Sequence, residues 1–207
     1  MIAMEAVVRG LGLDLVGVAD LRRLEGMPSG LASGAGSVLG RYRYAIVLGA
    51  QLGKFGRGAS VTRVNAEMER AALDVLGYVE RTGHRGLIVH TEDEFDPVGR
   101  FGLLSLKVLA KDAGLGWQGR SLLIISPEHG PVHRWIAVLT DLELRPGAPV
   151  PNRCGECTAC VDECPYDALR LVRFDDHPER REDVLDTRAC RGDDGCQVCL
   201  DVCPWAK

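Results

Sequence analysis

Apolar residues along the first 145 positions gather into short runs, separated by glycine-rich or charged segments. Short runs rich in valine, isoleucine and leucine, bounded by turn-forming residues, are typical of buried β-strands. The pattern predicts strands at Leu15–Ala19, Tyr44–Leu48, Gly86–His90, Ser121–Ser126 and Trp135–Thr140. The last two are joined by the turn PEHGPVH, so we expect them to form an antiparallel pair.

Three other segments have a helical pattern. Residues 1–12 end in glycine, Ser60 is placed to cap a long helix that runs to about Thr82, and Leu103–Ala113 is broken by the sequence GLG. The expected apolar face of the long helix consists of Ala66, Ala71, Leu73, Leu76 and Val79.

Glycine, serine and acidic residues predict loops at 26–40, 49–60 and 91–99, and three prolines predict a linker at Leu144–Arg153. Strands and helices interleave, but the closing strand pair is antiparallel. We therefore expect an α+β domain at residues 1–145 and a second domain at 146–207.

All eight cysteines lie in the last 54 residues, in two runs. The runs are Cys154-x2-Cys157-x2-Cys160-x3-Cys164-Pro165 and Cys190-x5-Cys196-x2-Cys199-x3-Cys203-Pro204. The first matches the bacterial ferredoxin run and the second ends in the same way, which predicts two 4Fe–4S clusters.

In two-cluster ferredoxins the last cysteine of each run binds the other cluster. One cluster is therefore expected on Cys154, Cys157, Cys160 and Cys203, and the other on Cys164, Cys190, Cys196 and Cys199. The five-residue spacer after Cys190 departs from the regular pattern.

Two other uses of the cysteines are weighed against clusters. Disulfides do not suit the expected cytoplasmic location, which follows from the lack of a signal peptide in MIAMEAVVRG. Zinc knuckles also use C-x2-C pairs, but as separated pairs rather than three cysteines in seven residues.

The charge is uneven along the chain. Residues 1–150 hold 17 Lys and Arg against 16 Asp and Glu, and residues 151–207 hold 8 against 13. The acidic second part argues against nucleic-acid binding there and suits a basic partner that delivers electrons. No stretch reaches the roughly 20 apolar residues that a membrane span needs, so no membrane is expected.

The segment AGLGWQGRSLLIISPEHGPVHRWIAVLTDLEL at Ala113–Leu144, followed by CGECTACVDECPYDAL and GCQVCLDVCPW, resembles epoxyqueuosine reductase. The resemblance covers about Leu104 to Trp205. It implies a nitroreductase-like α/β sandwich, a fold shared with reductive dehalogenases and flavin nitroreductases. It also implies a base-off cobalamin that receives electrons from two 4Fe–4S clusters.

Three departures from that family affect the expected activity. The helical-repeat extension that grips transfer RNA would follow Trp205, where this chain has two residues, so binding of transfer RNA is not expected. The family's general acid falls near Arg100, with Asp96 four residues earlier. The N-terminal half is also short, so the substrate is expected to differ. Tyr44 is a further weak candidate for proton transfer.

In the family the AGLGW turn lies against the corrin ring or its tail. The resemblance implies cofactor contacts from Gly114, Gly116, Trp117, Gly119, Arg120 and Ser121. Glycines would let the backbone approach a flat ring closely. The other interpretation is a helix C-cap followed by a tight turn, and for Trp117 simple core packing.

Three functions remain open. The first is a cobalamin-dependent reductase of a small molecule or modified base, supplied by a low-potential donor of the ferredoxin or flavodoxin type. The second is an electron-transfer protein, such as a ferredoxin-like protein or a reductive activator of a corrinoid partner, with no substrate of its own. The third is a reductase that binds FMN on the same fold.

Overall fold

The computed structural model describes residues 13–24, 40–52, 61–90, 94–96, 101–102, 104–192 and 195–206. The predicted helix at 1–12 lies outside these residues. So do residues 26–39 and 53–60, which make up most of two predicted loops.

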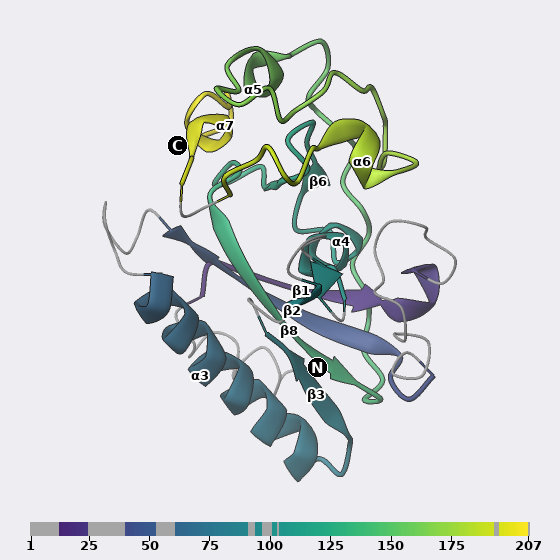
Figure 1. Cartoon of the computed structure of the whole chain (residues 1–207). Coiled ribbons are helices and arrows are strands. Elements are labelled where there is room, and N and C mark those ends of the chain that lie inside the picture. Colours follow the sequence, from purple (N-terminus) through teal and green to yellow (C-terminus); the bar gives the residue numbers. More distant parts are fainter. Residues whose placement is uncertain are drawn as a thin grey trace.

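The centre of the fold is a four-stranded antiparallel sheet with the strand order β1-β2-β8-β3 (Figure 1). The strands are β1 at Leu15–Asp20, β2 at Tyr44–Gln51, β3 at Gly86–Val89 and β8 at His133–Thr140. β2 and β8 pair along their whole length, from Tyr44 opposite Thr140 to Gln51 opposite His133. Strands were thus predicted correctly at these four places, although β2 runs three residues into the predicted loop at 49–60.

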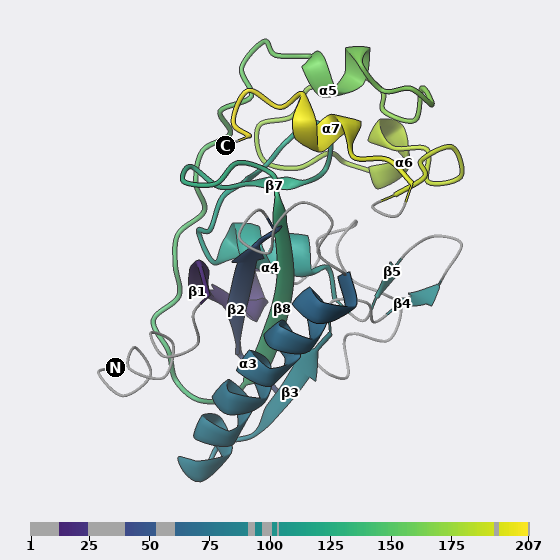
Figure 2. The same ribbon diagram turned by 90° about the vertical axis from the view of Figure 1, so that its left-hand side faces the viewer.

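Helices cover both faces of this sheet. Ile46 and Leu48 of β2 pack with α3 (Val61–Arg81), whereas Ala45 and Val47 belong to the core beneath α4 (Leu106–Asp112). Successive residues of a strand point to opposite faces, so the middle of each central strand, such as Ala45–Leu48 in β2 and Trp135–Leu139 in β8, is apolar without interruption. Figure 2 shows the sheet between the two helices.

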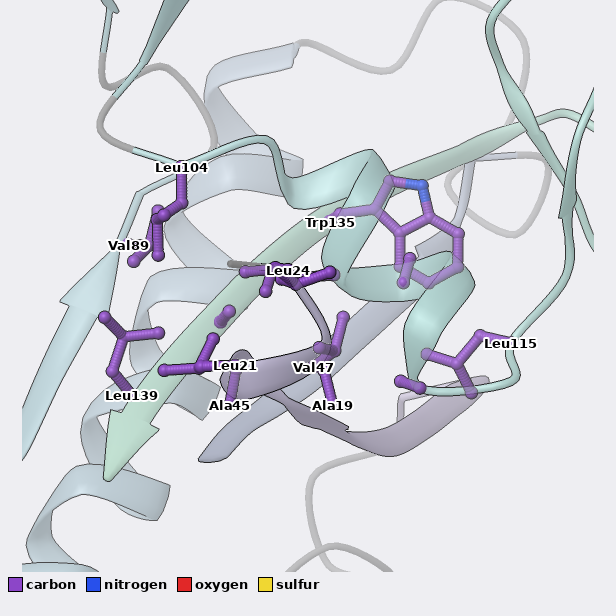
Figure 3. Packing of buried hydrophobic residues seen from close by; sticks show 14 of the residues in the cluster. Ala19, Leu21, Leu24, Ala45, Val47, Val89, Leu104, Leu115, Trp135 and Leu139 are labelled. Atoms are coloured by element: carbon purple, nitrogen blue, oxygen red, sulfur yellow. The ribbon is translucent and has the colours of Figure 1, made fainter. Parts of the chain in front are cut away.

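The core on the α4 side extends across the sheet. Figure 3 shows Trp135 and Leu115 at one end and Val89, Leu104 and Leu139 at the other. With α3 on the opposite face, the domain is a three-layer α/β sandwich. This architecture confirms the predicted α+β sandwich class.

The apolar face of α3 differs from the one predicted. Ala71 and Val79 are buried and Leu76 packs against the same core, as expected, but Ala66 is exposed and Leu73 is 58% exposed. The face that packs on the sheet consists of Val64, Met68, Ala71, Ala72, Val75 and Val79. These positions recur three or four residues apart, and Ala66 and Leu73 lie off that stripe.

The predicted antiparallel pair of Ser121–Ser126 with Trp135–Thr140 is wrong. β7 (Ile124–Ile125) pairs instead with β6 (Trp117–Gln118), and β8 lies between β2 and β3. A bridge between Ser126 and Gly130 closes the turn. Pro131 then follows, which cannot donate a ladder hydrogen bond, so the chain leaves the hairpin and joins the main sheet.

Two further boundaries differ from the sequence-based expectation. The predicted acidic loop contains β4 (Glu94–Asp96), which pairs with β5 (Phe101–Gly102). The predicted helix from Leu103 begins at Leu106, because the hydroxyl of Ser105 accepts a hydrogen bond from the Val108 amide, at 3.4 Å, and caps it.

The cysteine-containing segment lies at one end of the sheet, beyond β6 and β7 (Figures 1 and 2). It has only single-turn helices, at Ala159–Asp162 (α5), Arg181–Val184 (α6) and Val198–Asp201 (α7). Residues 144–153 form no helix or strand, as the prolines predicted. The boundary between domains at 145 stays a prediction. Among the described residues, no helix has the length and hydropathy needed to cross a membrane.

Candidate iron–sulfur site

The two expected ligand sets are each drawn from both cysteine runs, and thiols of the two runs act on one another in the structure. Burial, followed by the charges of Cys154, Cys199, Cys157 and Cys203, raises the pKa of Cys160 to about 12. Burial, followed by the charges of Cys190, Cys196 and Cys164, raises the pKa of Cys199 to about 11. The charge of Cys199 also raises the pKa of Cys160, so the two sets of thiols are close neighbours.

The position of Cys203 distinguishes a crossed arrangement from a simple one. Burial is the main cause that raises its pKa, and the thiols that add to the effect are Cys154 and Cys157 of the first run. Cys164 in turn affects Cys199 of the second run. Each terminal cysteine and thiols of the other run therefore influence one another, which agrees with the crossed ligand sets, and the assignment itself stays a prediction.

The spacing of the thiols also bears on the zinc alternative. Within the described part of the chain, which includes all eight cysteines, no three His, Cys, Asp or Glu side chains are grouped to hold one metal ion. A zinc ion needs its four ligands at about 2.0–2.3 Å from one centre. A cubane has its thiolates on different iron atoms. The donor type, eight thiols in two runs, therefore fits 4Fe–4S clusters, which are held by cysteine thiolates.

Local turns place the cysteines of each run. The amide of Cys157 donates to the carbonyl of Cys154 at 3.0 Å, and the amide of Cys164 donates to Val161 at 3.2 Å at the end of α5. In the second run the longer spacer forms a turn at Gly192, whose φ is +66° and whose amide donates to the Cys190 sulfur at 3.4 Å. The irregular spacing is thus taken up locally.

The glycines of the predicted cofactor turn lie against the protein's own chain. Gly114 has φ +77°, and a Cβ there would lie 2.5 Å from the carbonyl oxygen of Ala148. A Cβ on Gly116 would collide with the carbonyl of Ile125. At Gly119 the Cβ would meet the Ile125 side chain, and it would lie 3.6 Å from the sulfur of Cys154. Close approach is indeed the reason for glycine here, but the approaching groups belong to this chain.

The side chains of this turn also have partners within the protein. Trp117 is 1% exposed and makes an edge-to-face contact with Trp205, with ring centroids 4.9 Å apart. Arg120 donates one terminal nitrogen to the carbonyl of Gly155 at 2.6 Å and the other to that of Cys157. Ser121 is partly buried. In this structure the turn therefore supports the first cysteine run, and its role in contacting a second cofactor stays a prediction.

Two residues that the sequence analysis did not single out connect the cysteine segment to the sandwich. Asn152 accepts a hydrogen bond from the Cys154 amide at 2.9 Å and donates to the carbonyl of Gln118 at 3.0 Å. Lys111 of α4, which is 6% exposed, pairs with Asp176. An asparagine two residues before a cysteine is a recognisable turn signal, whereas the partner of Lys111 is visible only in the structure.

Of the three candidates for proton transfer, the structure describes the side chain of Tyr44 alone. Arg100 lies outside the described residues, and Asp96 lies in β4, where only the backbone is described. Tyr44 is buried opposite Thr140, seven residues along β8 from His133, which is roughly 23 Å at about 3.3 Å per residue. Tyr44 therefore lies at one end of β2, and Gln51, which pairs with His133, lies at the other end.

Comparison with known proteins identifies the class of the cysteine segment and then a specific relative. Residues 153–207 match the family described as 4Fe-4S dicluster domain. An epoxyqueuosine reductase from Synechococcus sp. (strain CC9605) is 37% identical over 114 residues, which cover 48% of this chain and 35% of the relative. The match thus spans about a third of that protein's length.

Solved structures show the same fold over nearly the whole chain. The epoxyqueuosine reductase of Bacillus subtilis, with its catalytic loop swung out, superposes with a TM-score of 0.71 at 16% identity, covering 99% of this chain and 64% of that one. An epoxyqueuosine reductase bound to a tRNA stem loop superposes with a TM-score of 0.69 at 18% identity, covering 98% and 64%. A reductive dehalogenase, for which a B12-dependent mechanism was suggested, superposes with a TM-score of 0.60 at 20% identity, covering 80% and 25%.

These similarities confirm the resemblance inferred from the sequence. The chain is similar in sequence to epoxyqueuosine reductase over about half its length, and it is shorter than those relatives. It shares its fold with epoxyqueuosine reductases and reductive dehalogenases, and it carries a 4Fe–4S dicluster domain at its C-terminal end.

Proposed function

We propose that this chain is an iron–sulfur oxidoreductase that holds two 4Fe–4S clusters in a crossed arrangement. The supporting observation is the grouping of the thiols, in which Cys203 lies with the first run and Cys164 with the second. When bound, such clusters supply one-electron transfer, and their potentials depend on hydrogen bonds and solvent exposure. The chain's own part is to hold the thiols in two sets, shield most of them partly from solvent, and keep Cys154 close to the turn at Gly119.

Paired substitutions test this crossed arrangement. Cys154→Ala combined with Cys203→Ala removes ligands from one cluster only, so iron should fall from about eight to about four atoms per chain. Cys154→Ala combined with Cys164→Ala removes one ligand from each set and should leave markedly less iron. Both variants lose two thiols, so each is a matched control for the other.

The measurement is iron and acid-labile sulfide per chain after anaerobic reconstitution, with electron paramagnetic resonance of the reduced protein. The reverse order of iron retention would show that each run binds its own cluster. Zinc in place of iron in the wild-type protein would contradict the cluster proposal itself.

We further propose cobalamin as the electron acceptor, on the basis of the fold shared with a relative for which a B12-dependent mechanism was suggested. The glycines and Arg120 of the turn at 114–121 contact the chain itself, so a contact between this turn and cobalamin stays a prediction. The substrate class, a small molecule or a modified base, is carried over from the epoxyqueuosine reductases as part of the proposal.

A second candidate is an electron-transfer protein without its own substrate, which the same filled turn favours. Addition of cobalamin to the reconstituted protein, followed by gel filtration and an absorption spectrum, separates the two. Corrin bands that co-elute with the protein support the reductase. Reduction of cobalamin that stays free in solution supports the electron-transfer protein, and a co-eluting flavin spectrum after addition of FMN would replace cobalamin in the first proposal.

A further inference from the structure

Arg120 is a buried cation at the base of the first cysteine run. The residue is 7% exposed, and its guanidinium donates to the carbonyls of Gly155 and Cys157. Its Nε is buried without a hydrogen-bond partner in the part of the chain that the structure describes. A buried charge with incomplete pairing is costly, so a compensating negative group is expected next to it.

No carboxylate of the described residues forms an ion pair with Arg120. Glu156 is an acidic group on which the Arg120 charge acts. Its pKa is held below its usual range first by its hydrogen bond with Arg173 and by the Arg173 charge, and only weakly by Arg120. Glu156 is therefore paired with Arg173, with 2.5 Å between Nη1 of Arg173 and Oε1 of Glu156. The first cysteine run is the other source of negative charge in this loop when its thiols bind metal, and the sulfur of Cys154 lies 3.6 Å from a Cβ built on Gly119, the neighbour of Arg120.

Arg120 also fixes the direction of two peptide groups in the loop. In a trans peptide the C=O and the following N–H point in opposite directions. With the carbonyls of Gly155 and Cys157 directed at Arg120, the amides of Glu156 and Thr158 point away from it. Among the described residues, neither amide donates to a backbone carbonyl.

The backbone at this point needs to be held from outside. Gly155 has φ +53°, and a Cβ there would meet nothing within 4 Å, so packing does not fix the turn. The two hydrogen bonds from Arg120 provide the restraint. A planar guanidinium can bind two acceptors at once in a fixed geometry, which a lysine cannot reproduce.

From these contacts we propose that Arg120 is a positioning residue that raises the reduction potential of the cluster on Cys154, Cys157, Cys160 and Cys203. Its charge stabilises the more negative, reduced state, and its two hydrogen bonds fix the peptide groups on either side of Cys157, which holds this ligand in place. Nearby charge is one of the factors that set such potentials, and groups that orient a ligand tune the metal it binds. The inference rests on the proposed cluster function.

The test is an anaerobic redox titration of the full chain, followed by electron paramagnetic resonance. Arg120→Met removes the charge and both hydrogen bonds. The equilibrium constant for reduction of one cluster should fall about tenfold or more, which corresponds to about 59 mV for one electron. The affected signal is assigned with the Cys154→Ala, Cys203→Ala variant, which lacks that cluster.

Arg173→Met is the matched control. Arg173 contacts the side chain of Glu156 in the same loop, but its own side chain is 56% exposed. Replacing it with methionine removes the same unit of charge as Arg120→Met. Because solvent screens exposed charges, both potentials should stay close to those of the wild type. Arg120→Lys keeps the charge but not the double contact, so its shift should fall between the control and Arg120→Met.

Iron content is measured for each variant, so that loss of the cluster is not mistaken for a change of potential. Arg120→Gln, which is neutral but keeps a side-chain N–H donor, is the second neutral variant. A loaded neutral variant with wild-type potentials would overturn the inference. Loss of the cluster from both neutral variants would also overturn it, because Arg120 would then be needed only to hold the loop. If the wild type itself bound no iron, the proposed function would fail instead.

Discussion

At the scale of the residue, His133 has an unusual environment. It is the first residue of β8, and its Nε2 lies 3.3 Å from the hydroxyl of Ser126. Burial, and then the charge of His129, lowers its pKa to about 4, whereas Asp14 acts in the opposite direction. The imidazole is therefore neutral at pH 7, and it can accept or donate a hydrogen bond without adding charge at the start of β8.

This pKa has a consequence for stability. Between pH 6.5 and 4 the unfolded chain binds a proton that the folded chain excludes, so the contribution of His133 is complete above pH 6.5 and is lost as the pH falls to 4. The loss is roughly 3–4 kcal/mol in total. His133→Gln should flatten the dependence of unfolding free energy on pH in this window, as measured by urea denaturation. An NMR titration that gave the imidazole a midpoint near 6.5 would contradict the prediction.

At the scale of the element, α3 shows how one helix divides its apolar residues between the sheet and solvent. Met68 is fully buried against the sheet, whereas Leu73 is 58% exposed. Met68→Ala should therefore cost about 2–5 kcal/mol of unfolding free energy, because it leaves a cavity. Leu73→Ala is the matched control and should change it by less than about 0.5 kcal/mol. Equal losses in chemical denaturation would mean that the helix packs with a different face.

At the scale of the whole molecule, charge bears on which partners can bind. The chain carries 25 Lys and Arg against 29 Asp and Glu, a net charge of −4, and the acidic excess lies in residues 151–207. A protein that binds nucleic acid gains most of its affinity from cations that neutralise phosphates. A related enzyme of the same fold has been seen with a tRNA stem loop, so the matter needs a direct test.

We expect this chain not to bind transfer RNA tightly at physiological salt. The measurement is filter binding with unmodified and epoxyqueuosine-containing stem loops, with a full-length epoxyqueuosine reductase as the positive control. A dissociation constant below about 1 μM, equivalent to about −8 kcal/mol, would show that the acidic surface does not prevent binding.

The sequence predicted the chemistry of the second half better than the geometry of the first. Cysteine spacing indicated a crossed pair of clusters because the ligands are close in sequence and their order reflects the local turns. The pairing of β7 with β6 could not be predicted in this way. A short apolar run does not specify which strand it pairs with. The turn closed by Ser126 and Gly130 leads into Pro131, where the chain leaves the hairpin, and this path is visible only in the structure.

The amino-acid sequence alone therefore determined the ligand type, the number of cysteine runs, the four main strands and the resemblance to epoxyqueuosine reductase. The tertiary structure decided what the turn at 114–121 contacts. Glycine spacing shows only that something must approach the backbone closely. The groups that approach here belong to Ile125, in the adjacent strand β7, and to Ala148 and Gly155, which lie far along the chain and are brought to the turn by folding.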